Sequence, residues 1–188
     1  MGIPGKATAV ATQSYFRQHS NISTTTVAGL DWQISQAGFG SYRVAAGEKT
    51  HEQALRQALQ GGINLIDTSS NYGDGGSERL IGRVLAEQFD AGELQREQVV
   101  LVSKVGYLQG FNYALAQQRK KEGRPFPNLV KYAEGLDHCI HPQFLDDQLT
   151  RSLERLNLDT LDVYLLHNPE YYLSWAQRRP IPLGEARR

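Results

Sequence analysis

Three ionisable residues, Asp67, Lys104 and His167, each close or follow a run of apolar residues typical of a buried strand. Each alone has a structural explanation: Asp67 could cap a turn, Lys104 could reach solvent, and His167 could be a hydrogen-bonded core histidine. The carboxyl ends of parallel strands in a barrel open on one face, which holds the active site. Because a charged group stands at three such ends, the pattern favours a catalytic site.

Tyr72 lies in the loop that follows Asp67. A lone tyrosine in a loop usually serves packing, but a lysine ammonium beside it favours the phenolate form. Such a tyrosine could give a proton to a carbonyl oxygen while a hydride reaches the carbonyl carbon. Asp67 would keep Lys104 charged and oriented, and His167 would bind or polarise the carbonyl oxygen.

Strand and helix patterns alternate along the chain, which predicts a parallel sheet with right-handed crossovers. Helical spacing of leucines after Pro142 places Leu145, Leu149, Leu153 and Leu156 on one side of a helix. Ser77 is expected to cap the N-terminus of the helix that follows it in the sequence. The strands are expected at Ile34–Phe39, Ile63–Asp67, Val99–Lys104 and Leu161–Leu166, and the helices at Glu48–Gln60, after Ser77 and from Pro142.

Other segments are less regular. Residues 1–23 are expected to form a polar leader, with one domain over residues 24–188. Thr24–Val27 and Trp32–Ser35 predict a β-hairpin. The segment Gly106–His141 is expected to be a long irregular connection of the functional or mobile kind.

A barrel and a doubly wound sheet both fit alternating strands and helices. The doubly wound dinucleotide fold needs G-x-G-x-x-G after its first strand, and Gly38–Arg43 lacks the third glycine. The cluster of His138, Cys139 and His141 lacks a second group of metal ligands. Gly73–Gly76 could bind an anion before a helix, but no lysine of a P-loop follows.

Several motifs in order resemble the aldo-keto reductase family. Gly62–Gly73 with Ser77–Gly82 is similar to the first signature of that family, Val102–Lys104 to its lysine strand and Leu158–His167 to its histidine strand. The hairpin before Gly38 is similar to the plug across the bottom of the family's barrel. The resemblance runs from about residue 24 to residue 175.

The resemblance implies a (β/α)8-barrel enzyme that interconverts carbonyls and alcohols with NADPH. Tyr72 would be the acid, assisted by Lys104, Asp67 and His167, and the substrate would be a small aldehyde, ketone or alcohol. Asp67 and the backbone of Gly40, Ser41 and Tyr42 would lie against the nicotinamide. Asn168 stands where many members have a tryptophan, so the resemblance implies an altered substrate pocket there.

The predicted units number about four, whereas such a barrel has eight strands and about 250 residues. The 188 residues are therefore expected to form a half-barrel, with Gly184–Arg188 as the start of a further helix. An open sheet edge would call for self-association or a second chain. The alternative function is a catalytically inactive fragment, or a non-enzymatic interaction module of the same family.

Composition narrows the class of protein. Twenty basic and twenty acidic residues give a net charge of zero, which indicates neither a nucleic acid nor an anionic membrane as partner. No segment approaches the roughly 18 apolar residues of a membrane span. The N-terminus has no apolar signal core and Cys139 is the single cysteine, so a cytoplasmic protein is expected.

Overall fold

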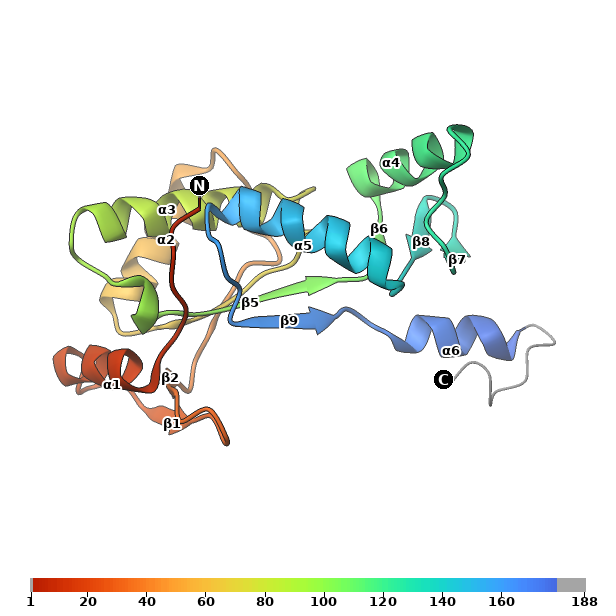
Figure 1. Cartoon of the computed structure of the whole chain (residues 1–188). Coiled ribbons are helices and arrows are strands. Elements are labelled where there is room, and N and C mark those ends of the chain that lie inside the picture. The colour runs from red at the N-terminus through yellow and green to blue at the C-terminus, as the bar shows by residue number, and fades with distance from the viewer. Residues whose placement is uncertain (1, 179–188) are drawn as a thin grey trace. The chain divides into compact units, whose positions relative to one another are not determined.

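The computed structural model describes residues 2–178 (Figure 1). Within them the chain folds into two compact units. The first unit runs up to Ser103 and includes Arg151–Tyr164, and the second comprises Lys104–Thr150 and the chain from Leu165 onward. The expected helix start at Gly184–Arg188 lies outside the described residues. No helix in the described part is long and apolar enough to cross a membrane.

One sheet carries the predicted strands. Its order is β3-β4-β5-β9, and the β3–β4 and β4–β5 pairs are parallel. The strands are β3 (Phe39–Gly40), β4 (Leu65–Asp67), β5 (Val100–Val105) and β9 (Val163–Leu166). Three of the four predicted strands are confirmed with slightly different bounds. The first is much shorter than predicted, because Ile34 and Ser35 belong to the hairpin instead.

The hairpin consists of β1 (Thr24–Thr26) and β2 (Gln33–Ser35), which pair antiparallel with Thr24 opposite Ser35. Its turn includes Gly29 and Asp31, both with positive φ. The antiparallel pairing confirms the predicted hairpin. Glycine and aspartate suit its turn because both adopt positive φ more readily than most residues.

The polar leader proves to contain a helix, α1 (Ala9–Gln18). Thr8 caps it by accepting a hydrogen bond from the Ala11 amide, and Tyr15 and Phe16 are buried on its inner side. The sequence pattern does not predict this helix, because its apolar face is small and stands among polar residues.

Helices α2 (Lys49–Gln60), α3 (Gly76–Asp90) and α5 (Pro142–Leu156) confirm the three predicted helices, and a short 3-10 helix, η1 (Arg96–Gln98), precedes β5. Helices α2 and α3 contact each other in the first unit (Figure 1). Helix α3 lies close to the end of α5, since a Cβ added to Gly82 would come within 2.6 Å of the backbone of Leu156. These elements enclose a core centred on Leu55, Ile66, Ile81 and Leu101.

Two details of these helices differ from the predictions. Ser77 does not cap α3; Gly75 is the N-cap residue and Ser77 is buried one residue inside the helix. The predicted leucine stripe of α5 is offset by one residue, and its leucines before Leu156 are only half-buried. The fully buried positions of α5 are Phe144, Gln148, Ser152 and Leu156.

The second unit corrects the prediction of an irregular segment at Gly106–His141. That segment forms a three-stranded antiparallel sheet of order β6-β8-β7 and a helix. Helix α6 follows β9. The elements are β6 (Tyr107–Leu108), α4 (Gly110–Lys121), β7 (Val130–Ala133), β8 (Leu136–His138) and α6 (Glu170–Gln177). Phe126 packs edge-on against Phe144, with ring centroids 5.1 Å apart.

Candidate active site

Asp67 is the last residue of β4 in the first unit. It pairs in register with Gly40 of β3 and with Val102 of β5. Its carbonyl oxygen accepts hydrogen bonds from the amide of Ser41 (3.0 Å) and from the Ser41 hydroxyl (2.9 Å). The chain after β3 is therefore tied to the end of β4, next to the Asp67 carboxylate.

Ser41 itself is buried, and its polar groups are in use. Its hydroxyl accepts from Ser77 Oγ at 2.8 Å, and its backbone oxygen also lies within hydrogen-bond distance of that hydroxyl. Gly40 and Tyr42 on either side are exposed, and a Cβ on Gly40 would meet no atom within 4 Å. Of the three residues whose backbone is expected against a nicotinamide, Gly40 and Tyr42 are exposed, whereas Ser41 is buried and anchors the turn.

Tyr72 lies in the loop between β4 and α3, also in the first unit. Its amide donates to the carbonyl oxygen of Ser69, and its own carbonyl oxygen accepts from the amide of Ser77. The half-buried Tyr72 ring meets the ring of Tyr42 edge-on, with centroids 5.2 Å apart. Backbone hydrogen bonds on both sides hold the loop that carries this phenol.

Lys104 and His167 belong to the second unit. Lys104 is the next-to-last residue of β5, and His167 directly follows β9; both are half-buried. The amide of His167 donates to the carbonyl oxygen of Val105 at 2.7 Å. Lys104 and His167 are therefore brought to neighbouring strand ends, as the sequence predicted.

The four expected catalytic residues are divided between the units. Asp67 and Tyr72 lie in the first, and Lys104 and His167 lie in the second. Strands β4, β5 and β9, which carry or precede the three charged residues, are consecutive in the order of the sheet.

Asn168, the expected substrate-binding residue, has a positive φ of 51°. Its side-chain oxygen accepts from the hydroxyl of Tyr107 at 2.9 Å, and its Nδ2 donates to Glu170 at 2.7 Å. The Glu170 carboxyl has a lowered pKa, chiefly because of this hydrogen bond from Asn168. Asn168 thus orders the chain after His167.

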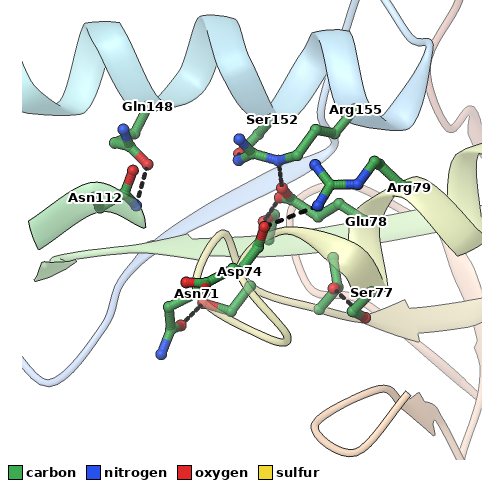
Figure 2. Close-up of polar contacts among 12 residues, drawn as sticks. Asn71, Asp74, Ser77, Glu78, Arg79, Asn112, Gln148, Ser152 and Arg155 are labelled. Carbon is green, nitrogen blue, oxygen red and sulfur yellow. Dashed lines mark hydrogen bonds and ion pairs between the residues drawn. The ribbon is translucent and has the colours of Figure 1, made fainter. Parts of the chain in front are cut away.

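Other polar residues emerge from the structure alone. Glu78 has no exposed surface, and its carboxylate pairs with Arg155 (Figure 2). The same carboxylate accepts a hydrogen bond from the hydroxyl of Ser103. In the second unit, the imidazole of His138 is buried against the backbone of His167. Ser77-Glu78 is part of the first signature, but no sequence signal pointed to Arg155 or His138 as partners.

The sequence also offered two other constellations, a metal cluster and an anion-binding loop before α3. The described residues contain no group of three or more His, Cys, Asp or Glu side chains that could hold a metal ion. At Gly75, before α3, an added Cβ would come within 2.5 Å of the side chain of Arg155. Gly75 therefore also allows close packing against an arginine side chain.

Comparison with known proteins identifies the family to which the chain is similar. The model of the Aldo/keto reductase family matches residues 37–181. NADH-specific methylglyoxal reductase from Escherichia coli (strain K12) is 30% identical over 145 residues, which are 73% of this chain and 39% of that protein. Aldo-keto reductase YhdN from Bacillus subtilis (strain 168) is 28% identical over 152 residues, 78% of this chain and 38% of that protein.

A solved structure, the holo form of aldo-keto reductase AKR11C1 from Bacillus halodurans, superposes with a TM-score of 0.58 at 22% identity. The match covers 85% of this chain and 48% of that one, and it shows a shared α/β fold of the barrel type. The chain spans less than half the length of each of these three proteins. Because the family model covers most of its residues, the chain belongs to the aldo/keto reductase family.

Proposed function

We propose that this chain carries the active site of a carbonyl reductase that interconverts aldehydes or ketones and alcohols with a nicotinamide cofactor. The observation that carries the proposal is the position of Asp67, Lys104 and His167 at or near the ends of β4, β5 and β9, consecutive strands of one sheet. Two similar Escherichia coli proteins are named methylglyoxal reductases, which supports a small carbonyl compound as substrate.

In the proposed reaction Tyr72 gives a proton to the carbonyl oxygen of the substrate, and takes it back in the oxidation of the alcohol. A phenol is a weak acid, so it needs a cation that favours its phenolate form. Lys104 supplies that cation, and Asp67 keeps Lys104 charged. His167 polarises the carbonyl oxygen, so negative charge on that oxygen is stabilised as the bond changes.

The last residue of β3 and the turn after it leave room for the flat ring of a nicotinamide. Gly40 leaves open space where a side chain would stand, and the exposed Tyr42 ring lies next to Tyr72. Ser41 holds this turn to Asp67 through two hydrogen bonds. When bound, the reduced cofactor would supply a hydride to the carbonyl carbon. NADPH is the expected form, whereas one relative is named NADH-specific.

Asn168 is proposed to shape the substrate pocket through the chain that it orders, because both ends of its side-chain amide already have partners. A substrate would therefore contact the turn after His167, because the Asn168 amide is already hydrogen-bonded to Tyr107 and Glu170. Asn168→Trp should therefore change the range of carbonyl substrates more than it changes the proton chemistry.

The first test is a fluorescence titration of the full chain with NADPH and with NADH. The second measures oxidation of whichever nucleotide binds when methylglyoxal is added as substrate. Saturable binding and turnover would support the proposal, and the ratio of the two affinities would identify the cofactor. If the chain neither binds a nicotinamide nucleotide nor reduces methylglyoxal, the proposal is contradicted, and a non-enzymatic member of the family is favoured. The mass in solution, measured on the same sample, reports self-association.

A further inference from the structure

His138, in β8 of the second unit, donates to the carbonyl oxygen of His167, with Nε2 and O 2.7 Å apart. The two residues are 29 positions apart in the chain, and His138 has no exposed surface. The segment that contains His138 thus reaches back to the residue that the proposed function uses to polarise the carbonyl oxygen.

The contact fixes the chemical state of the His138 ring. A carbonyl oxygen only accepts, so Nε2 carries the hydrogen. The other ring nitrogen, Nδ1, is buried and has no hydrogen-bond partner in the described part of the chain. A charged ring would need a partner for a second N–H in this dry position, so the neutral ring with its hydrogen on Nε2 is favoured. Burial accordingly lowers the pKa of His138.

The absence of a side chain at Gly106 leaves room for the hydrogen bond between His138 and His167. Its φ is +150°, and a Cβ added there would lie 2.5 Å from Nε2 of His138 and 2.8 Å from the carbonyl oxygen of His167. A side chain at this position would push the two groups apart. The glycine after β5 is thus the residue that allows the imidazole and the peptide to approach.

The backbone of His167 is held from two directions. Its amide donates to Val105, and its carbonyl oxygen accepts from His138. Its ring meets the ring of Tyr107 edge-on at 4.6 Å, and Tyr107 also meets His138 edge-on at 5.7 Å. Together these contacts limit how the imidazole of His167 can turn.

We propose that His138 is a positioning residue, whose buried Nε2–H group holds the peptide of His167 so that the His167 imidazole keeps one orientation toward a carbonyl substrate. This inference rests on the proposed function for the role of His167 in the reaction. The contact itself rests on geometry within the second unit, so it can be measured without turnover.

The experiment uses the full chain and three variants. His138→Leu removes the donor, and His138→Gln restores an N–H group at a similar reach. His141→Gln is the matched control, because it makes the same change three residues away. Long-range ¹H–¹⁵N spectra report the tautomer and charge of each of the five histidines, and the kinetics of carbonyl reduction are measured on the same samples.

In the unaltered chain, His138 should carry its hydrogen on Nε2, and it should gain a second proton only at a lower pH than an ordinary histidine does. His138→Leu should shift or broaden the ring signals of His167 and lower kcat about tenfold with little change in KM, the usual size for one hydrogen bond. His138→Gln should recover both. His141→Gln should leave the His167 signals and the kinetics unchanged.

His167 signals and kcat that are unchanged in His138→Leu would overturn the inference. If the unaltered chain has no turnover, the proposed function fails, and the His167 signals still decide whether His138 positions that ring. If His138→Leu does not fold, the titration of the unaltered chain decides instead. A His138 ring that carries its hydrogen on Nδ1, or that titrates like an exposed histidine, would overturn the inference.

Discussion

The carboxylate of Glu78 and the guanidinium of Arg155 form an ion pair inside the first unit, with Oε2 and Nε 2.6 Å apart (Figure 2). The Glu78 side chain is fully buried and that of Arg155 is 15% exposed. The second oxygen of Glu78 accepts from Ser103 Oγ at 2.7 Å. Because Ser103 directly precedes Lys104 in β5, this pair joins α3 and the end of α5 to the strand of the proposed catalytic lysine.

Breaking this pair should be costly. Glu78→Gln leaves the guanidinium of Arg155 without its charged partner, and we expect the free energy of unfolding to fall by about 3 kcal/mol, as for other buried pairs that lose one member. Urea unfolding followed by circular dichroism measures the change.

The control for this prediction is Glu52→Gln, which breaks the more exposed pair between Glu52 and Arg83. Its expected cost is below about 1 kcal/mol. If Glu78→Gln and Glu52→Gln lower the free energy of unfolding by the same amount, the buried pair stabilises the fold no more than the pair of Glu52 and Arg83 does, and the prediction is wrong.

Asp162 should be as important for the fold of the first unit. One of its oxygens accepts from the amide of Ala7 at 2.6 Å, and the other accepts from the amide of Leu101 and from Arg96. Asp162→Asn should lower the free energy of unfolding by about 3 kcal/mol, because the side chain of Arg96 is 3% exposed and its guanidinium loses its charged partner. Faster proteolysis near Ala7 should accompany the loss, whereas Asp159→Asn at an exposed position should behave like the unaltered chain.

Two glycine substitutions should differ sharply. Gly82→Ala would place a Cβ 2.6 Å from the backbone of Leu156, so α3 and α5 must move apart at a cost of about 2 kcal/mol. Gly40→Ala meets open space and should change the unfolding free energy by less than about 0.5 kcal/mol. It should nevertheless weaken nicotinamide binding, because the added methyl group stands on the proposed cofactor surface. Thermal melts and fluorescence titrations on both variants separate the two effects.

The buried His138 should make stability depend on pH. Burial lowers its pKa below the ordinary value of 6.5, while the hydrogen bond to His167 and the carboxylate of Glu170 act in the opposite direction. The unfolded chain therefore binds a proton at a higher pH than the folded chain does. The stability that the neutral His138 ring contributes is complete above about pH 6.5. It is lost as the pH falls toward the lowered pKa of His138 in the folded chain. Unfolding free energies measured across this range should fall less steeply in His138→Gln; an equal slope would contradict the assignment.

The parts that sequence predicted best have strong periodic or continuous apolar patterns. Strand β5 has a continuous apolar run, and α2 and α5 have clear amphipathic spacing, so all three appear close to their predicted bounds. The fold of Gly106–His141 was not predictable from the sequence, because its strands have only two to four residues each and α4 buries little besides Asn112 and Ala116. Short strands of this kind are stabilised by their neighbours, which a local pattern does not show.

The candidate site was predictable where a charged residue ends an apolar strand, as with Asp67, Lys104 and His167. It was not predictable where the partner is a distant backbone group or a packed side chain. His138 binds a carbonyl oxygen 29 residues away, and Glu78 pairs with Arg155 across 77 positions. Ser77 illustrates the same limit, because its hydroxyl bonds to Ser41 and Thr68 instead of capping α3.

The central claim is that Tyr72 is the acid of a carbonyl reductase, and the most direct measurement is kcat/KM for carbonyl reduction by Tyr72→Phe. Tyr113→Phe, the same change on α4, is the matched control. Removal of the Tyr72 hydroxyl should lower kcat/KM by about a thousandfold, within the usual range for a general acid, and leave the unfolding midpoint unchanged. Tyr113→Phe should keep the original rate. Turnover by Tyr72→Phe at the rate of the unaltered chain would contradict the account.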